Sequence, residues 1–306
     1  MNPEDPDLGI RMAAFEHLRK LVAVHGPVLP WALLSDGFSY RGDRILFGST
    51  PRGIHRPRQM QGGALSIKTT VPKPGRTARY DDQLASEAGH FVYKFQGDDP
   101  RARDNQLLHV AYRLQAPLIY LYGIDPGLYR PLWPVFITGW DPGNLQCLVS
   151  VDEAAAIVDT EEEQVVGLRR RYATVQAKKR LHQDAFRTRV LRAYQTRCAV
   201  CRLPRAELLD AAHILPDRDV RGRPEVPNGL SLCRLHHAAY DQDLMGIRPD
   251  RGIEIAPRLM KEHDGPVLEQ ALKGFHGRSI WVPRRMHLRP RMEYLEERFE
   301  GFRMAG

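Results

Sequence analysis

The sequence predicts an α+β protein with an N-terminal domain of mixed α/β or β-barrel-like architecture, a long basic linker helix and a C-terminal domain that contains paired cysteine motifs. Three observations predict this fold class. Apolar stretches separated by Gly/Pro turns occupy the first half of the chain, a strongly basic helical segment follows, and paired cysteine motifs lie near residue 200. The predicted boundaries are 1–155, 156–195 and 196–306, a domain number that suits 306 residues.

The chain is basic. It has 45 Lys and Arg residues against 37 Asp and Glu, a formal net charge of +8, which favours an acidic partner and nucleic acid first. No apolar run approaches the ~18 residues that a membrane span requires, so we expect no membrane partner. The N-terminus is acidic and lacks the apolar core of a secretory signal, so we expect a cytoplasmic protein.

The first 150 residues mix short helical patterns with strand patterns. Phe15, Leu18 and Leu21 have helical spacing, and Gly26-Pro27 ends that helix in a turn. The other expected elements are a short helix from Pro30 to Leu34, strands at Phe91–Phe95, Ala116–Ile124 and Trp133–Trp140, and a helix at Asn105–Leu114. This mixture indicates one α/β or barrel-like domain.

The segment from Gln164 to Arg205 holds twelve Lys or Arg residues and one acidic residue, Asp184. Leu168, Tyr172 and Val175 maintain an apolar stripe, which predicts a long helix. A charged face that meets only solvent usually mixes both signs, so this imbalance favours a surface that faces phosphate groups. The candidate DNA contacts on this helix and in the following domain are Arg169, Arg170, Arg171, Lys178, Lys179, Arg180, Arg187, Arg221 and Arg223.

Two metal-ligand motifs lie in the C-terminal domain. Cys198 and Cys201 form a CxxC motif, and Cys233 and His236 repeat its spacing with a histidine in the last place. Two-residue spacers let both ligands of such a motif reach one ion, and four N/S ligands suit tetrahedral Zn²⁺. In a reducing compartment, clustered cysteines indicate a metal site rather than disulfides. Cys147 lies far upstream and is assigned to packing.

A structural zinc ion does not explain the polar residues around these motifs. Asp210 and His213 lie on a short apolar strand, and Asn228 begins a second strand after a charged loop. His237 and Asp241 are four residues apart, which places both side chains on one face of a helix. Assigning His236 to the zinc motif and His237 to this helix pair keeps both spacings intact.

In the order CxxC, AAHILP, NGLSLC and HHAAYD, residues 186–250 resemble the HNH (His-Asn-His, ββα-metal) endonucleases, in the subgroup that carries zinc knuckles. The resemblance implies a DNA endonuclease that hydrolyses phosphodiester bonds with one divalent cation, Mg²⁺, Mn²⁺ or another. It implies that His213 is the general base and that Asn228 orients it through a backbone contact. His237 and Asp241 would hold the divalent cation.

One position departs from the family pattern. Many members have a metal-ligating His or Asp immediately before the general base, and here that residue is Ala212. Asp210 lies two residues earlier, on the same face of a strand as Ala212. It could supply the missing ligand directly or through water, or it could only hydrogen-bond a loop. The sequence leaves these two interpretations open.

The order of an N-terminal sensor, a basic helix and an HNH domain resembles bacterial restriction endonucleases. Several of these join HNH to an SRA-like or other PUA-like domain that reads a modified base. The resemblance implies double-stranded DNA as the partner, with methylated or hydroxymethylated cytosine among the candidate modifications, and a homodimer would allow both strands to be cut. It makes Tyr80, Asp82, Tyr93 and Asp98 candidates for a base pocket.

Two other functions fit parts of the sequence. An HNH nuclease could instead read unmodified DNA or act as a toxin. A zinc-stabilised, non-catalytic DNA-binding regulator would need the cysteines and arginines, but it has no use for His213, Asn228, His237 and Asp241 together.

Beyond residue 250 we expect only packing elements. These are strands at Gly252–Ala256 and Ile280–Val282, a helix around Val267–Phe275 and a final helix at Pro290–Phe302.

Overall fold

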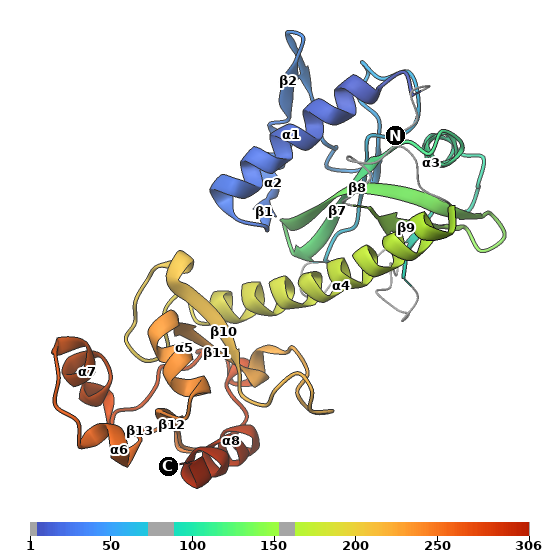
Figure 1. Ribbon diagram of the computed structural model, residues 1–306. Helices are drawn as coiled ribbons and strands as arrows, with labels where there is room; N and C mark the ends of the chain where they lie inside the picture. Colours follow the sequence, from blue (N-terminus) through green and yellow to red (C-terminus); the bar gives the residue numbers. More distant parts are fainter. Residues whose placement is uncertain (1–4, 73–88, 153–162, 306) are drawn as a thin grey trace. The chain divides into compact units, whose positions relative to one another are not determined.

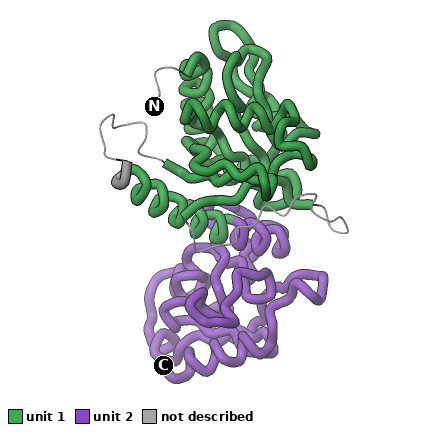
Figure 2. The backbone as a smooth tube through the Cα atoms, turned by 90° about the vertical axis from the view of Figure 1, so that its right-hand side faces the viewer, with its two compact units in different colours: residues 1–184 green, residues 185–306 purple. Residues whose placement is uncertain are grey.

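The computed structural model describes residues 5–72, 89–152 and 163–305 (Figure 1). The chain divides into two compact units, Met1–Asp184 and Ala185–Gly306 (Figure 2). The long basic helix is α4 (Glu163–Ala193), and its residues are divided between the two units. The division into three parts with a separate linker at 156–195 therefore stays a prediction.

The N-terminal unit is built on a mixed sheet. Its strand order is β4 (Ile54–His55), β5 (Ser66–Lys68), β7 (Leu118–Asp125), β8 (Leu128–Asp141), β9 (Gln146–Val151) and β6 (Phe91–Lys94), with β1 (Leu29–Pro30) paired to β8. Strands β5 and β7 run parallel, and the other pairs are antiparallel. Within the described residues this path does not return on itself, so the predicted SRA/PUA-like barrel is not confirmed. A separate hairpin joins β2 (Phe38–Tyr40) to β3 (Asp43–Ile45).

Three helices accompany this sheet before α4: α1 (Leu8–His25), α2 (Trp31–Ser35) and α3 (Arg103–Arg113). Phe15 and Leu18 of α1 are buried in one core cluster with Ile119 and Leu121 of β7, so the apolar spacing predicted from the sequence is the spacing that packs. The predicted strands near 91, 116 and 133 and the predicted helix near 105 are confirmed as β6, β7, β8 and α3.

Several cations of α4 belong to the N-terminal packing. Asp152 is fully buried, and both Arg169 and Arg170 donate to its carboxylate at 3.0 Å. Arg170 also lies over the ring of Phe136, at 4.4 Å from its centroid. Lys178 is 8% exposed, and burial lowers its pKa. These three side chains stabilise the fold, which does not fit the phosphate contacts expected of them.

The C-terminal unit is centred on a two-stranded hairpin and a short helix. Strand β10 (Leu209–His213) pairs antiparallel with β11 (Gly229–Cys233), and α5 (Arg234–Asp241) follows directly. The single-turn helices η1 (Ala206–Leu208) and η2 (Val226–Asn228) precede the two strands. The remaining elements are β12 (Met245–Ile247), β13 (Ile253–Ile255), α6 (Pro257–Met260), α7 (Pro266–Ala271), η3 (Lys273–Phe275), η4 (Met286–Leu288) and α8 (Met292–Ala305).

One predicted strand is wrong. Residues 280–282 form no strand, and the neighbouring Ser279 makes only an isolated bridge to Gly252. Among the described helices, none is both long enough and apolar enough to cross a lipid bilayer.

Candidate active site and metal centre

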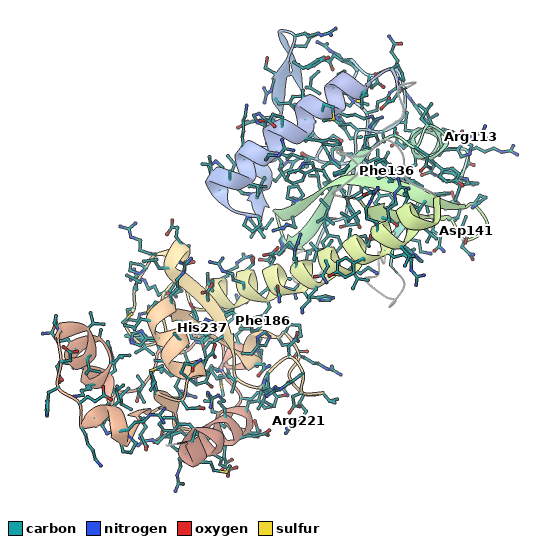
Figure 3. The ribbon with its side chains drawn as sticks, viewed as in Figure 1. Arg113, Phe136, Asp141, Phe186, Arg221 and His237 are labelled. Atoms are coloured by element: carbon teal, nitrogen blue, oxygen red, sulfur yellow. The ribbon has the colours of Figure 1, made fainter. Side chains whose placement is uncertain are left out.

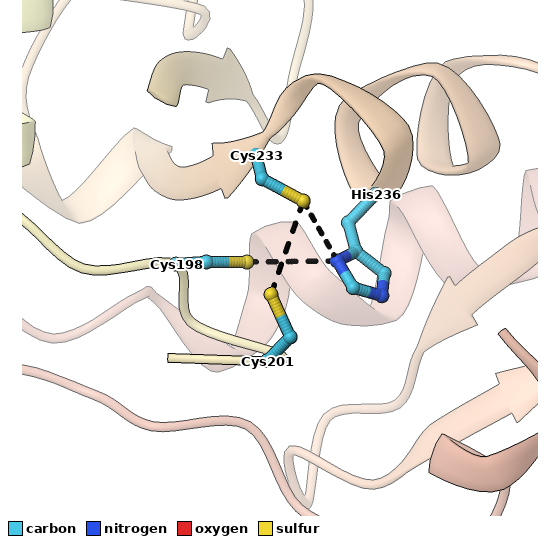
Figure 4. A group of neighbouring side chains, drawn as sticks. All are labelled: Cys198, Cys201, Cys233 and His236. Atoms are coloured by element: carbon cyan, nitrogen blue, oxygen red, sulfur yellow. Dashed lines mark hydrogen bonds between the residues drawn. The ribbon is translucent and has the colours of Figure 1, made fainter. Parts of the chain in front are cut away.

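The four predicted zinc ligands lie together (Figure 4). The ligand atoms of Cys198, Cys201, Cys233 and His236 are all within 4.8 Å of one another. His236 Nδ1 is 3.0 Å from the Cys233 sulfur and 3.6 Å from the Cys198 sulfur, and the Cys201 and Cys233 sulfurs are 3.9 Å apart. Ligands at about 2.0–2.3 Å from a tetrahedral zinc ion are separated by roughly 3.4–3.8 Å, so this cluster has the size that zinc requires.

A hydrogen bond of His236 Nε2 determines which nitrogen of the ring faces the three sulfurs. Nε2 lies 2.8 Å from the carbonyl oxygen of Ala271, and the ring is 1% exposed. When Nε2 donates its hydrogen to that carbonyl, Nδ1 is left with a free lone pair directed at the sulfurs. Metal-ligating histidines are commonly held in this way. The donor set therefore fits a Cys₃His metal centre.

The β10–β11 hairpin positions His213. The register pairs His213 with Gly229, so His213 lies at the end of the ladder. Asn228 is buried just before β11, and its side chain joins both polar atoms of the Leu215 backbone: Oδ1 accepts from the N–H at 2.9 Å, and Nδ2 donates to the carbonyl at 3.0 Å. The Asn228 carbonyl accepts from Ile214 N–H at 3.0 Å. Asn228 thus clamps the backbone that immediately follows His213.

Phe186 of α4, which is labelled in Figure 3, forms the other support of His213. The two rings are stacked, with centroids 4.0 Å apart and an interplanar angle of 19°. Gly229 makes this stacking sterically feasible, because a β-carbon there would lie 2.5 Å from Val190 and 2.9 Å from Phe186. A sequence reading could identify Phe186 as part of an apolar stripe, but its partner is fixed only by tertiary packing.

His237 lies between two carboxylates. Its Nε2 is 3.3 Å from Asp241, and its Nδ1 is 3.9 Å from Asp210. The carboxylates therefore approach different nitrogens of one ring. Among the described residues, the Cys₃His centre is the only group of three or more His, Cys, Asp or Glu residues whose ligand atoms all lie within 4.8 Å of one another. In this conformation Asp210, His237 and Asp241 do not converge on a single point. Asp210 also faces Arg187, at 3.6 Å.

An open cleft of about 570 Å³ runs beside these residues. His213, His237 and Asp241 line it, so the predicted general base and the predicted metal-binding pair share one cavity. Arg218 and Arg298 also line the cleft. Sequence reasoning missed Arg298, which comes from α8 and is held by Asp243 at 2.6 Å and by the Tyr240 carbonyl at 2.5 Å. No local pattern could have found it, because α8 follows more than fifty residues after α5.

The electrostatic environment of His213 favours the neutral imidazole. Burial lowers its pKa, and nearby His237 lowers it further, while Asp217 and Asp241 act in the opposite direction. Its Nε2 is buried and has no hydrogen-bond partner among the described residues. Unsatisfied buried polar atoms are rare in folded proteins and call for an explanation such as a catalytic role.

The remaining predicted DNA-contact residues do not gather in one place. Arg187 donates to the carbonyls of Ala206 and Leu209 at 2.8 Å, and exposed Arg221 contacts both Asp219 and Glu297. Their guanidinium groups are thus engaged within the protein. The other candidate phosphate contacts, Arg171, Lys179, Arg180 and Arg223, are exposed.

The predicted base pocket is not supported in its described part. Tyr93 is 2% exposed and meets the ring of Tyr120 edge-on, so it offers no face on which a base could stack. Asp98 is exposed after β6. Tyr80 and Asp82 lie outside the described residues.

Comparison with known proteins bears on the C-terminal unit. Residues 198–248 match the family model described as HNH endonuclease. No curated protein matches the chain. Among solved structures, the modification dependent TagI restriction endonuclease aligns over 78% of this chain and 81% of that chain, with 15% sequence identity and a TM-score of 0.27. A TM-score of this size does not establish a shared fold.

The match covers the Cys₃His centre, the β10–β11 hairpin and α5. The chain therefore carries an HNH endonuclease domain, a class of metal-dependent nuclease that hydrolyses DNA.

The geometry of the Cys₃His centre predicts one tightly held zinc ion per chain. We expect Cys233→Ala to lose that ion and to unfold the C-terminal unit at lower temperature, because binding of a structural metal contributes directly to folding. Elemental analysis and thermal melting measure both effects.

Cys147→Ala is the matched control, since Cys147 is a buried cysteine of the N-terminal unit, outside the Cys₃His centre. It should keep a full zinc content whatever it costs in packing. Full zinc content in Cys233→Ala would contradict the assignment.

Proposed function

We propose that this protein cuts DNA through a one-metal HNH site with His213 as general base, and that its N-terminal unit directs the nuclease to base-modified DNA as a restriction enzyme. The observation that carries the first part is the shared cleft. His213 on β10 and the pair His237–Asp241 on α5 line one cavity, as a base and a metal site must if both act on one phosphodiester.

The role of His213 follows from its surroundings. A general base must be unprotonated at the working pH, and burial lowers the pKa of His213 below the ordinary histidine value. Phe186 stacks on the imidazole ring of His213, and Asn228 hydrogen-bonds to the backbone that follows His213. His213 would accept the proton of the attacking water while these contacts keep its orientation fixed.

His237 and Asp241 would hold the divalent cation, Mg²⁺ or Mn²⁺, through Nε2 and the carboxylate. When bound, such an ion stabilises the negative charge that develops on the phosphate and assists the leaving oxygen. Asp210 faces the other nitrogen of His237, Nδ1. A carboxylate at this position commonly orients a histidine that binds a metal through its second nitrogen. The geometry thus favours a positioning role for Asp210 over direct ligation, with zinc in the Cys₃His centre remaining structural.

The second part of the proposal concerns the N-terminal unit. It is a separate compact unit, and it contains a cavity of about 520 Å³ between α1, β8 and α4. Trp133 and Phe15 contribute to the lining together with the charged Arg19 and Glu16. The cavity has the size of small-molecule sites, and its mixture of an aromatic side chain with polar groups suits an extrahelical base. A double-strand break would need two HNH sites, so a homodimer belongs to this proposal.

Replacing His213 should abolish cutting without affecting the fold. We expect His213→Ala to lose about 10²–10⁴-fold in the rate of plasmid nicking with Mg²⁺ or Mn²⁺, because that is the usual contribution of a positioned base. The zinc content should be unchanged. His182→Ala, an exposed histidine of α4, is the control and should cut at the wild-type rate. Full activity of His213→Ala would exclude His213 as the base.

The pH dependence should report the same group. Because His213 must be neutral and burial lowers its pKa, the acid limb of kcat/KM should lie below pH 6.5 and the rate should level off above it. Phe186→Ala admits water to the ring, so the pKa should rise and the limb should move upward. A limb that does not respond to Phe186→Ala would point to another titrating group.

Dependence on modification is tested with matched plasmids that are unmodified, cytosine-methylated, hydroxymethylated, glucosylated or adenine-methylated. We expect rapid cutting of one modified plasmid only, with Trp133→Ala removing that preference and leaving the metal requirement unchanged. Equal cutting of all plasmids would retain the nuclease and reject the sensor.

A further inference from the structure

The last third of the C-terminal unit contains a cationic segment that the nuclease site does not use. Between Glu269 and Glu293 the sequence has six Lys or Arg residues and no acidic residue. The central part, 278–289, has little regular structure apart from η4, and Arg289 fixes its path by donating to the carbonyls of Pro283 and Arg284 at 3.0 and 3.4 Å. The exposed guanidinium groups of Arg284 and Arg285 therefore lie on a loop whose backbone path is fixed.

Trp281 connects this segment to the zinc centre. The backbone N–H of Trp281 donates to the carbonyl of Ala199, between Cys198 and Cys201, at 2.8 Å. Arg202, the residue after Cys201, lies over the indole ring at 4.4 Å from its centroid. Trp281 nevertheless remains 58% exposed. An exposed tryptophan that carries a stacked arginine presents an apolar face and a positive charge side by side.

The charges of this surface are unpaired. Arg284 and Arg285 are exposed, and neither guanidinium group has an ion pair or hydrogen bond with any residue that the structure describes. Elsewhere in the same unit, Arg221, Arg248 and Arg298 each form an ion pair with a carboxylate.

The segment that forms this surface also contacts the backbone next to Asn228, a residue that supports the active site. The N–H of Arg291 donates to the carbonyl of Pro227 at 3.1 Å, next to Asn228, which clamps the strand end that carries His213. One end of the cationic segment is thus tied to the zinc knuckle and the other to the catalytic hairpin.

We propose that Arg202, Trp281, Arg284 and Arg285 form a second DNA-contact surface, the Trp281 surface, which binds the backbone of the substrate duplex outside the cleft. The three guanidinium groups contact phosphates, and the indole packs against a sugar. This inference rests on the proposed nuclease function, because DNA is the polyanion that the same unit hydrolyses. It also adds to the charge that α4 can offer, since Arg169, Arg170, Lys178 and Arg187 of that helix are engaged within the protein.

The test measures binding of the full chain to a 30-bp duplex as a function of salt, in an His213→Ala background that prevents cutting. We expect the double variant Arg284→Ala/Arg285→Ala to weaken binding by about tenfold or more. It should also reduce the slope of log Kd against log[salt] by roughly two, because each phosphate contact contributes about 0.9 to that slope. Trp281→Ala should weaken binding with little change in slope, because the indole carries no charge, and Trp281→Phe should restore most of the affinity.

The matched control is Lys261→Ala/Arg303→Ala, which removes the same charge from two exposed positions of the same unit and should leave the slope unchanged. Thermal melting and zinc content of every variant identify any loss of fold. A double variant at 284 and 285 with wild-type slope and affinity would overturn the proposal.

Failure of the proposed function would be seen separately. A wild-type chain that cuts no DNA, but whose salt slope falls in the double variant, would retain the Trp281 surface and reject the nuclease proposal.

Discussion

Helix α5 carries two adjacent histidines with different tasks, and the placement of both depends on the Cys₃His centre. Successive residues of an α-helix are rotated by about 100°, so His236 and His237 point to different sides. His236 is buried against three sulfurs and donates to Ala271, whereas His237 lines the cleft beside Asp241. Because Cys233 ends β11 and caps α5, a metal bound by Cys233 and His236 fixes the junction between strand and helix. The register of β11 with β10 then places His213 opposite the same helix face.

The distribution of positive charge shows why composition alone misplaces a binding surface. Helix α4 has a strongly one-sided charge, yet Arg169 and Arg170 are held by a fully buried carboxylate, and truncating that carboxylate would leave two guanidinium groups without their partner. Arg284 and Arg285, in contrast, are exposed and have no carboxylate partner among the described residues. Whether an arginine side chain has an internal partner is set by tertiary packing, so only the folded chain reveals it.

The parts of the site that the sequence could predict are those with local spacing. The CxxC motifs and the His237–Asp241 pair are set by the geometry of a knuckle and of one helical turn, and the first of these is confirmed as a cluster. Phe186 and Arg298 reach the site across 27 and 57 residues from His213 and Asp241, so no local periodicity indicates them. The sequence leaves the role of Asp210 open, because tertiary packing sets which nitrogen of His237 its carboxylate approaches, here Nδ1 at 3.9 Å. In the N-terminal unit, the parallel pairing of β5 with β7 spans fifty residues, and the apolar patterns that predicted the strands could not specify it.

The proposed mechanism requires that His237 and Asp241 hold the catalytic ion in the cleft lined by His213. The most direct measurement is a crystal of the protein soaked in Mn²⁺, with the ion located by anomalous scattering. We expect a peak at about 2.0–2.2 Å from His237 Nε2 and a carboxylate oxygen of Asp241, distinct from the zinc peak at the Cys₃His centre. A manganese peak elsewhere, with His237 and Asp241 left uncoordinated in an active enzyme, would contradict it.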